Sequence, residues 1–372
     1  MHLLKLVSSQ VRLGEPLPWG VRDAQGQLLL ARGQVIASQG QLDALLERGA
    51  AVDVEEVRAA ARAEAEAAAR PVSLFVHWER ALWHLDRVLR GIAEPGFPGR
   101  IDELSRHVVA LVDRDPDIAV WLSVRQDPKR LTIYALAHSV HCAAIARLTG
   151  QRLGWDEDRT LTLVKAALTM NIVTLDLQGR LAAQGVKPTP AQIELIRPHP
   201  VQGAQMLRDA GVDDTLWLET VEQHHERPDG SGYPRGLTTV GETATVLRQL
   251  DVFLAKMAPR AMRAPLPTQL AARQLFQEDG GGPVSAAIIK EFGIYPPGDF
   301  VQLKSGEMAV VVRRTANART PMAAAITDRH GMPMVNTIVR DTGRPDFAIT
   351  AVVADKSLLL RVPPERLYGL PE

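Results

Sequence analysis

A helical pattern of apolar residues fills the middle of the chain. From Val72 to about Phe292, apolar residues recur three and four positions apart, as in Leu104-Val108-Leu111-Val112. This spacing places side chains on one face of an α-helix. Clusters of Gly and Pro interrupt the pattern at 94–99, 185–190 and 198–200, and such clusters indicate turns. We therefore expect an all-α domain of many helices.

The first 57 residues instead alternate polar and apolar positions between turn signals. The segment Val21–Leu30 predicts a β-hairpin with its turn at Gln25-Gly26. Ser38 is a typical helix-capping residue and predicts a helix through Leu46, which Gly49 ends. These elements indicate a small α+β module.

Two further changes of pattern follow along the chain. Residues 57–70 are almost entirely Ala, Glu and Arg, which are strong helix formers with little to bury, so they predict a helical connector. Beyond residue 296, short runs typical of β-strands replace the helical pattern. These runs are Phe300–Leu303, Met308–Val312, Ala323–Ile326 and Phe347–Ile349. We expect a small antiparallel sheet or barrel there.

Together these patterns predict a multi-domain fold class. A central all-α helical domain is flanked by a small N-terminal α+β module and a small C-terminal β module. The expected boundaries are 1–57 for the α+β module, 58–71 for the connector, 72–124 for a helical extension, 125–295 for the central domain and 296–372 for the antiparallel β domain.

Composition narrows the class of partner and the compartment. The 43 basic residues balance the 43 acidic ones, so charge gives no reason to expect nucleic acid or an acidic membrane as a partner. Cys142 is the one cysteine, which excludes an internal disulfide and fits a reducing compartment. Met1–Gln10 lack the features of a signal peptide, and no apolar run approaches the ~20 residues that cross a bilayer. We expect a cytoplasmic protein without a membrane span.

Two adjacent histidines stand in an unusual string. In His224-His225-Glu226-Arg227-Pro228-Asp229-Gly230-Ser231-Gly232-Tyr233-Pro234 they precede an acid and a turn rich in Gly and Pro, although the whole chain has only ten histidines. The string closely resembles the signature of HD-GYP domains, the all-helical metal-dependent phosphodiesterases that hydrolyse the bacterial messenger cyclic di-GMP. The resemblance covers about residues 125–300 and implies an HD-like fold for the central domain.

The resemblance also implies a set of site residues. The metal ligands that it assigns are His138, His199, His224, His225 and Asp251. His141, one turn from His138, is a rival for the first position, and Glu226 is a candidate helper. Arg260 and Arg263 match family arginines that contact substrate phosphates, a role that suits a guanidinium group. The histidines without ligand spacing are His77, His84, His107 and His330.

The His-Asp pair of the family is missing. Met170 and Asn171 stand at the pair, while Val173 and Thr174 replace the Gly and the Lys of the family pattern. A thioether is a poor ligand for hard cations, and an amide brings no charge. Asp251 is then the one anion left among the matched ligands, so two dications would be poorly compensated. The degenerate site is expected to hold one divalent metal weakly (Mn, Fe or Mg) or none.

Each of these residues also has a simpler interpretation. Apolar residues trace more than one face of a helix expected over Leu161–Leu177, and a helix that is apolar on most sides is buried. Met170 is then a core residue, and Asn171 is a buried amide with hydrogen-bonded partners. Likewise, His138 on a helix rich in Ala and Leu fits a core histidine, and His199 before Pro200 fits a capping turn.

The segment after the double histidine indicates a recognition loop. Successive helical residues point about 100° apart, so a buried histidine pair can meet one cluster only near a helix end. Pro234 favours an extended Tyr233 whose ring projects from a stiff, exposed loop. The partner-binding residues that we predict are Asp229, Gly230, Gly232, Tyr233 and Pro234. In some relatives this edge docks diguanylate cyclase domains; the alternative is a tight turn that merely links two helices.

Two functions of different class follow. The first is a non-catalytic cyclic di-GMP sensor or protein-interaction module, because Met170, Asn171 and Thr174 replace the catalytic positions. The alternative is an active metal-dependent cyclic di-GMP phosphodiesterase or phosphohydrolase with an atypical site. A purely structural interaction protein is a third class. In each case we expect one cluster in the helical core, made of His138, Asn171, His199, His224, His225 and Asp251.

Overall fold

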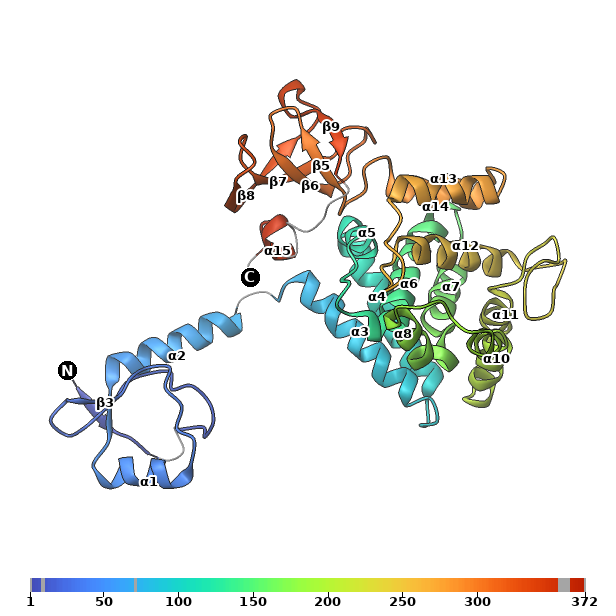
Figure 1. Cartoon of the computed structure of the whole chain (residues 1–372). Coiled ribbons are helices and arrows are strands. Elements are labelled where there is room, and N and C mark those ends of the chain that lie inside the picture. The colour runs from blue at the N-terminus through green and yellow to red at the C-terminus, as the bar shows by residue number, and fades with distance from the viewer. Residues whose placement is uncertain (1, 8–10, 70–71, 354–361, 371–372) are drawn as a thin grey trace. The chain divides into compact units, whose positions relative to one another are not determined.

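The structure, a computed structural model, describes residues 2–7, 11–69, 72–353 and 362–370 (Figure 1). The chain forms two compact units, Met1–Val72 and Ser73–Glu372. Each unit has its own hydrophobic core, so each is described separately.

The first unit is a four-stranded antiparallel sheet with two helices. The strands are β1 (Leu3–Lys5), β2 (Val21–Arg22), β3 (Leu28–Leu30) and β4 (Ala51–Asp53), in the order β1-β4-β2-β3. The predicted hairpin is confirmed, since β2 pairs with β3 across a turn in which Gly26 has a φ of 86°. The predicted cap is confirmed as well, because the Ser38 side chain accepts a hydrogen bond at the start of α1 (Gln39–Glu47).

The expected connector is part of a packed helix. Helix α2 (Val54–Ala69) begins three residues before the predicted start, and its Val57 and Ala60 pack on the core of the first unit. The Glu56 carboxylate accepts hydrogen bonds from the backbone N–H of Gly20 (2.7 Å) and from Arg22 (3.1 Å). The start of this segment therefore belongs to the α+β module rather than serving only as a spacer.

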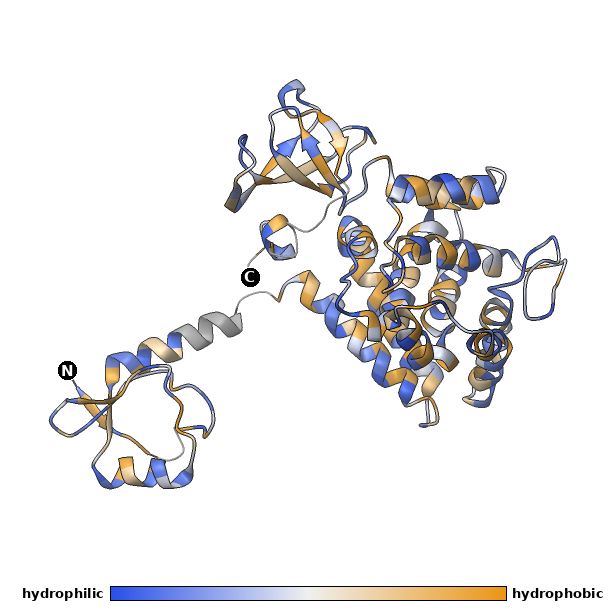
Figure 2. Cartoon of the chain, in the orientation of Figure 1, coloured by the Kyte–Doolittle hydropathy of each residue, from blue (hydrophilic) through white to orange (hydrophobic). Residues whose placement is uncertain are grey.

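The second unit is a helical assembly joined to a sheet. Its helices are α3 (Leu74–Arg90), α4 (Phe97–Arg114), α5 (Pro116–Val124), α6 (Tyr134–Arg152), α7 (Glu157–Thr169), α8 (Leu175–Ala183), α9 (Pro190–Ile196), α10 (His199–Asp209), α11 (Thr215–Gln223), α12 (Glu242–Met257), α13 (Thr268–Glu278) and α14 (Pro283–Phe292). Hydrophobic and hydrophilic residues alternate around these helices (Figure 2), as the helical spacing predicted. Helix α6 lies at the centre, because it contacts helices from both earlier and later parts of the unit.

Two segments of this unit are more apolar than the sequence pattern suggested. Leu131–Arg152 and Glu157–Ala183 are long and apolar enough to cross a membrane by length and composition, so the expectation that no such run exists is wrong. In both segments 72% of the apolar window is buried inside the protein. Both segments are rich in Ala, Leu and Thr and pack at the centre of the core, and this packing accounts for their composition.

The helix expected over Leu161–Leu177 is broken. Helix α7 ends at Thr169, Met170 and Asn171 follow, and the 3-10 turn η3 (Ile172–Thr174) leads into α8. The change of direction brings α8 against the 3-10 turn η2 (Leu131–Ile133), where a Cβ on Gly179 would meet the carbonyl oxygen of Thr132 at 2.1 Å. The pair Met170-Asn171 therefore lies at a helix end and not within a helix.

The C-terminal sheet has five antiparallel strands in the order β8-β7-β6-β5-β9. They are β5 (Phe300–Leu303), β6 (Met308–Arg313), β7 (Met322–Thr327), β8 (Pro333–Asp341) and β9 (Ile349–Val352), with the 3-10 turn η4 (Pro345–Phe347) before β9 and the short helix α15 (Pro364–Leu367) last. Strand β8 was not predicted, and Phe347 lies in η4 rather than in a strand. Phe300, Val310 and Ala324 join the core of the helices, so sheet and helices share one core.

Candidate metal centre

Four helices bring the predicted ligands together. His138 lies in α6, His199 begins α10, His224 and His225 follow the last residue of α11, and Asp251 lies in α12. The side chains of His138, His199 and His224 are at most 1% exposed. The expected position of the double histidine at a helix end is confirmed, because His224 caps α11.

Backbone carbonyls orient two of the imidazoles. His199 Nδ1 lies 2.7 Å from the carbonyl oxygen of Ile196, and His224 Nδ1 lies 2.6 Å from that of Val221. Each Nδ1–H therefore donates to its carbonyl, which leaves the lone pair on Nε2. The two Nε2 atoms are 3.2 Å apart. Carbonyl groups that fix a tautomer in this way are typical of histidines that bind metals.

A cation is the group that best satisfies the two lone pairs. Burial, together with the neighbouring His224, lowers the pKa of His199 to about 3, and burial also lowers the pKa of His224. Near pH 7 both rings are then neutral, and neither carries a proton to place between the Nε2 atoms. The ligand atoms of His199, His224 and His225 all lie within 4.8 Å of one another, so these residues fit one divalent cation.

Asp251 links the histidine cluster to His138. Its Oδ1 is 2.7 Å from His138 Nε2, and its Oδ2 is 3.7 Å from His225 Nδ1. Burial alone would raise the pKa of Asp251, but the hydrogen bond and the charge of His138 outweigh burial and bring this pKa below its usual range. The carboxylate is therefore ionised and is the anion of the centre.

Met170 and Asn171 stand where the family pattern has its His-Asp pair, and both side chains are packed against neighbouring residues. Met170 is fully buried in the main core, as its simpler interpretation predicted. Asn171 is 3% exposed, and its Oδ1 accepts a hydrogen bond of 2.6 Å from Gln178 Nε2. The same Gln178 amide donates to Thr174 Oγ1 at 2.9 Å. Asn171 therefore bonds to Gln178, which also bonds to Thr174. The other five residues that we expected in one cluster form that cluster.

The rivalry between His138 and His141 is resolved by their contacts. His138 bonds to Asp251, whereas His141 lines a different cavity with Ala137 and Val140. His138 also stacks on Tyr134, with ring centroids 5.3 Å apart. Tyr134 was not singled out from the sequence, although its place four residues before His138 puts both on one helix face.

Glu226 bonds to the backbone of the loop that follows the double histidine. Its buried carboxylate accepts backbone hydrogen bonds from Arg235 (2.7 Å) and Leu237 (3.0 Å). Gly232 lies against this residue, since a Cβ at position 232 would meet the Glu226 Cα at 2.5 Å. Glu226 therefore holds the loop that follows the double histidine.

The Tyr233 ring turns inward, which contradicts the expectation of an exposed ring. It stacks on His225 with centroids 4.5 Å apart, and the Arg197 guanidinium lies 5.7 Å from its centre. Burial raises the pKa of Tyr233. The bonds to Glu226 draw the loop onto the cluster, so its exposed part is Arg227–Asp229 with Ser231, while Gly230, Gly232 and Pro234 are half-buried.

The two predicted phosphate-binding arginines differ in exposure. Arg260 is half-buried and donates from Nη2 to the Tyr134 hydroxyl (3.0 Å), with its guanidinium 4.9 Å from the centre of that ring. Arg263 is exposed and donates to the carbonyl oxygen of Ala255 (2.6 Å). Only Arg263 therefore fits the expected exposed surface, because Arg260 is half-buried and bonds to Tyr134.

Comparisons with known proteins agree with this geometry. Residues 121–281 match the family model of the HD domain. A cyclic di-GMP phosphodiesterase of Pseudomonas aeruginosa is 28% identical over 298 residues, which are 78% of this chain and 68% of that protein. A cyclic di-GMP phosphodiesterase of Thermotoga maritima is 28% identical over 141 residues, 36% of this chain and 38% of that protein.

A solved structure is similar as well. An HDG"Y"P protein from Bdellovibrio bacteriovorus aligns with a TM-score of 0.49 at 16% identity, over 77% of this chain and 97% of that one. The family match and the curated relatives confirm the resemblance that the double-histidine string indicated.

Proposed function

We propose, from the premise that the chain is HD-GYP-like, that it is a cytoplasmic cyclic di-GMP signalling protein whose metal centre is degenerate. It acts as a sensor of the nucleotide or as a protein-interaction module and does not hydrolyse the nucleotide. The observation that carries the proposal is the buried pair Met170-Asn171 at the end of α7, where the family pattern has its His-Asp pair.

Charge balance favours one metal over two. Asp251 is the single carboxylate among the five clustered donors, and it already bonds to His138. Asn171 is neutral, and one lone pair of its oxygen is taken by Gln178. Two dications in this buried place would be left with most of their charge uncompensated, which costs several kcal/mol per ion. A single cation at the Nε2 atoms of His199 and His224 avoids that cost.

Nucleotide binding does not require a complete metal centre. Arg263 is exposed near the turn that follows α12, and a guanidinium binds phosphate oxygens by charge-assisted hydrogen bonds. The exposed loop residues Arg227–Asp229 supply a polar edge beside the cluster. We propose that this edge docks a signalling protein such as a diguanylate cyclase domain, as the family resemblance suggests.

An active phosphodiesterase is the second candidate. The five-residue cluster supports it, because the Nε2 atoms of His199 and His224 are already aligned for a cation. In that case a single metal would polarise the phosphate and supply the hydroxide nucleophile. This candidate requires that catalysis proceed without the aspartate that the family pattern has at position 171.

Elemental analysis combined with a turnover assay separates these candidates. The purified chain is measured for Mn, Fe and Mg and for hydrolysis of cyclic di-GMP with added Mn²⁺. One metal or none per chain, nucleotide binding and background hydrolysis support the proposal. About two metals with turnover support the enzyme, and neither metal nor nucleotide binding supports a structural scaffold. His224→Ala tests whether metal and activity belong to the cluster, with the exposed His330→Ala as its control.

A further inference from the structure

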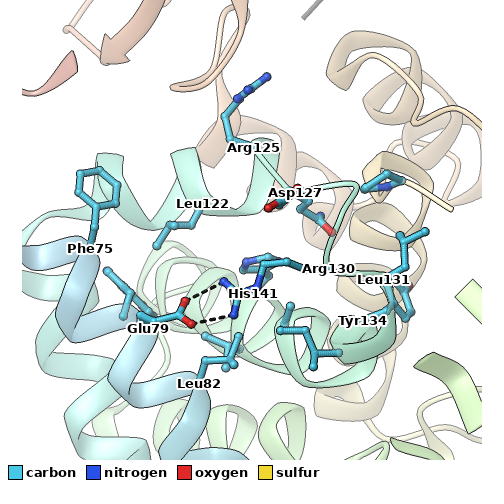
Figure 3. Close-up of a pocket in the computed structure, with 16 residues that line it drawn as sticks. Phe75, Glu79, Leu82, Leu122, Arg125, Asp127, Arg130, Leu131, Tyr134 and His141 are labelled. Carbon is cyan, nitrogen blue, oxygen red and sulfur yellow. Dashed lines mark hydrogen bonds and ion pairs between the residues drawn. The ribbon is translucent and has the colours of Figure 1, made fainter. Parts of the chain in front are cut away.

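A second cavity lies beside the metal centre. It has a volume of about 150 Å³ and is bounded by α3, the end of α5, η2 and α6 (Figure 3). Its apolar wall consists of Phe75, Trp78, Leu82, Leu122, Ile133 and Val140. An apolar cavity of about 150 Å³ is large enough to bind a benzene ring, so the space fits a monocyclic aromatic molecule.

Two of the charged groups at this cavity, Glu79 and Arg130, are paired with each other. The Glu79 carboxylate accepts two hydrogen bonds from the Arg130 guanidinium, of 2.7 and 2.8 Å, as Figure 3 shows. Arg125 turns away from the middle of the cavity, and its guanidinium lies 4.9 Å from the centre of the Phe300 ring. Glu79 and Arg130 neutralise each other, and Arg125 points away from the middle of the cavity, so the cavity favours an uncharged ligand.

Three buried polar atoms of the described lining residues lack hydrogen-bond partners, and Arg125 Nε is one of them. Trp78 Nε1 and His141 Nδ1 have no hydrogen-bond partner within the part of the chain that the structure describes. An unsatisfied buried donor or acceptor costs roughly 1–3 kcal/mol. Burial lowers the pKa of His141 to about 3, so near neutral pH its ring is uncharged. A hydroxyl group suits both atoms, because it can accept from the indole N–H and can donate to or accept from the imidazole.

We propose that this cavity binds a small, uncharged aromatic alcohol of the phenol class. The ring occupies the apolar wall, and the hydroxyl group bonds to Trp78 Nε1 or His141 Nδ1. The site is distinct from the histidine cluster, and the proposal does not depend on metal binding or on the nucleotide.

Calorimetric titration of the full chain with phenol, in the presence of a chelator, tests the proposal. We expect saturable binding with a dissociation constant below about 10 mM. Benzoate has a similar ring but carries a charge, and we expect it to bind at least about tenfold more weakly. His141→Phe and Trp78→Phe keep an aromatic ring and remove the polar ring nitrogens, so each should weaken phenol binding about threefold to tenfold.

Ala137→Leu adds bulk to a residue that lines the cavity and should abolish phenol binding. The matched control is Ala191→Leu, at an exposed position of α9, which should bind phenol like the unchanged chain. Thermal melts establish that each variant is folded, and the two aromatic variants decide the matter if Ala137→Leu is not. Phenol that fails to saturate, that binds equally to all variants, or that binds no better than benzoate overturns the proposal.

Discussion

The two halves of the metal centre have opposite chemistry. In the half made by His138, His199, His224, His225 and Asp251, every side chain faces another polar member of the cluster. In the half made by residues 170–174, Met170 packs into the core and Asn171 bonds to Gln178. Met170 and Asn171 are buried, as are His138, His199 and His224, whereas the side chains of His225 and Asp251 are 18% and 15% exposed. The difference teaches that one side of a polar cluster can be closed without a void, because apolar and amide groups supply the packing and bonding there.

The largest expected effect of this asymmetry is on catalysis. Hydrolysis of cyclic di-GMP by the purified chain should be at background with Mn²⁺, because the incomplete half lacks both ligands and the Lys at 174. One preorganised electrostatic contact alone is worth ~10²–10³-fold in rate, so their joint loss should remove several orders of magnitude. Product formation is measured by chromatography. Robust turnover that His224→Ala abolishes would contradict the inference that residues 170–174 make the centre inactive.

The affinity for Mn²⁺ should depend only on the half of the centre that contains the four histidines and Asp251. His224→Ala removes one of the two aligned Nε2 atoms, and we expect Mn²⁺ affinity to fall by about 100-fold or more, since even supporting residues around a metal contribute ~10–100-fold. Met170→Ala should leave the affinity nearly unchanged. Mn²⁺ titration monitored by calorimetry measures both. Equal losses in the two variants would show that residue 170 takes part in metal binding.

Low pH should lower the free energy of unfolding of the metal-free protein, because His199 gains a proton on unfolding. The unfolded chain protonates His199 near pH 6.5, whereas in the folded protein its pKa is about 3. The unfolded state therefore binds more protons between these values, and stability is full above pH 6.5 and is lost as pH falls towards 3. Between pH 7 and 5 the loss from this residue is up to about 2 kcal/mol. Urea denaturation at both pH values measures it, and His199→Gln should reduce the difference.

The half made by residues 170–174 should instead depend for its stability on the hydrogen bonds of the Gln178 amide. Gln178→Ala removes the donor to both Asn171 and Thr174, and we expect the free energy of unfolding to fall by about 1–2 kcal/mol. Gln205→Ala, an exposed control on α10, should change it by less than about 0.5 kcal/mol. If Gln178→Ala is neutral, bonding to Gln178 is not what replaces the lost ligands.

The smallest effect is expected at the surface. Arg263→Ala should weaken cyclic di-GMP binding by about threefold to tenfold at low salt, and the difference should shrink as salt rises because exposed charges are screened. Arg319→Ala is the matched control at an exposed position of the C-terminal sheet region. Titrations at two salt concentrations measure the effect. An unchanged affinity would remove Arg263 from the nucleotide site.

The sequence predicted those features that depend on local residue types. The hairpin at Gln25-Gly26, the cap at Ser38 and the helix end at His224 follow from turn and capping residues a few positions away. The clustered ligands were found through the family string, since spacing alone could not bring His138 to Asp251 across 113 residues.

The features that were missed depend on distant contacts. The inward turn of Tyr233 follows from the bonds of Glu226 to the backbone of Arg235 and Leu237. Strand β8 escaped prediction because its apolar residues are largely exposed at the edge of the sheet, Val335 at 79%, so no buried face marks it. The apolar pattern does not encode the break after Thr169, which is accompanied by a close contact of α8 with Thr132.

The ring of Tyr134 lies between the proposed phenol site and the candidate metal centre. It lines the phenol cavity on one side and stacks on His138, which bonds to Asp251, on the other. Linkage is reciprocal: if an occupant of the cavity shifts this ring and changes Mn²⁺ affinity by a given factor, then Mn²⁺ changes the affinity for that occupant by the same factor. In the proposed non-catalytic role the centre would then still transmit information, because its metal occupancy would set how tightly the neighbouring cavity holds its ligand.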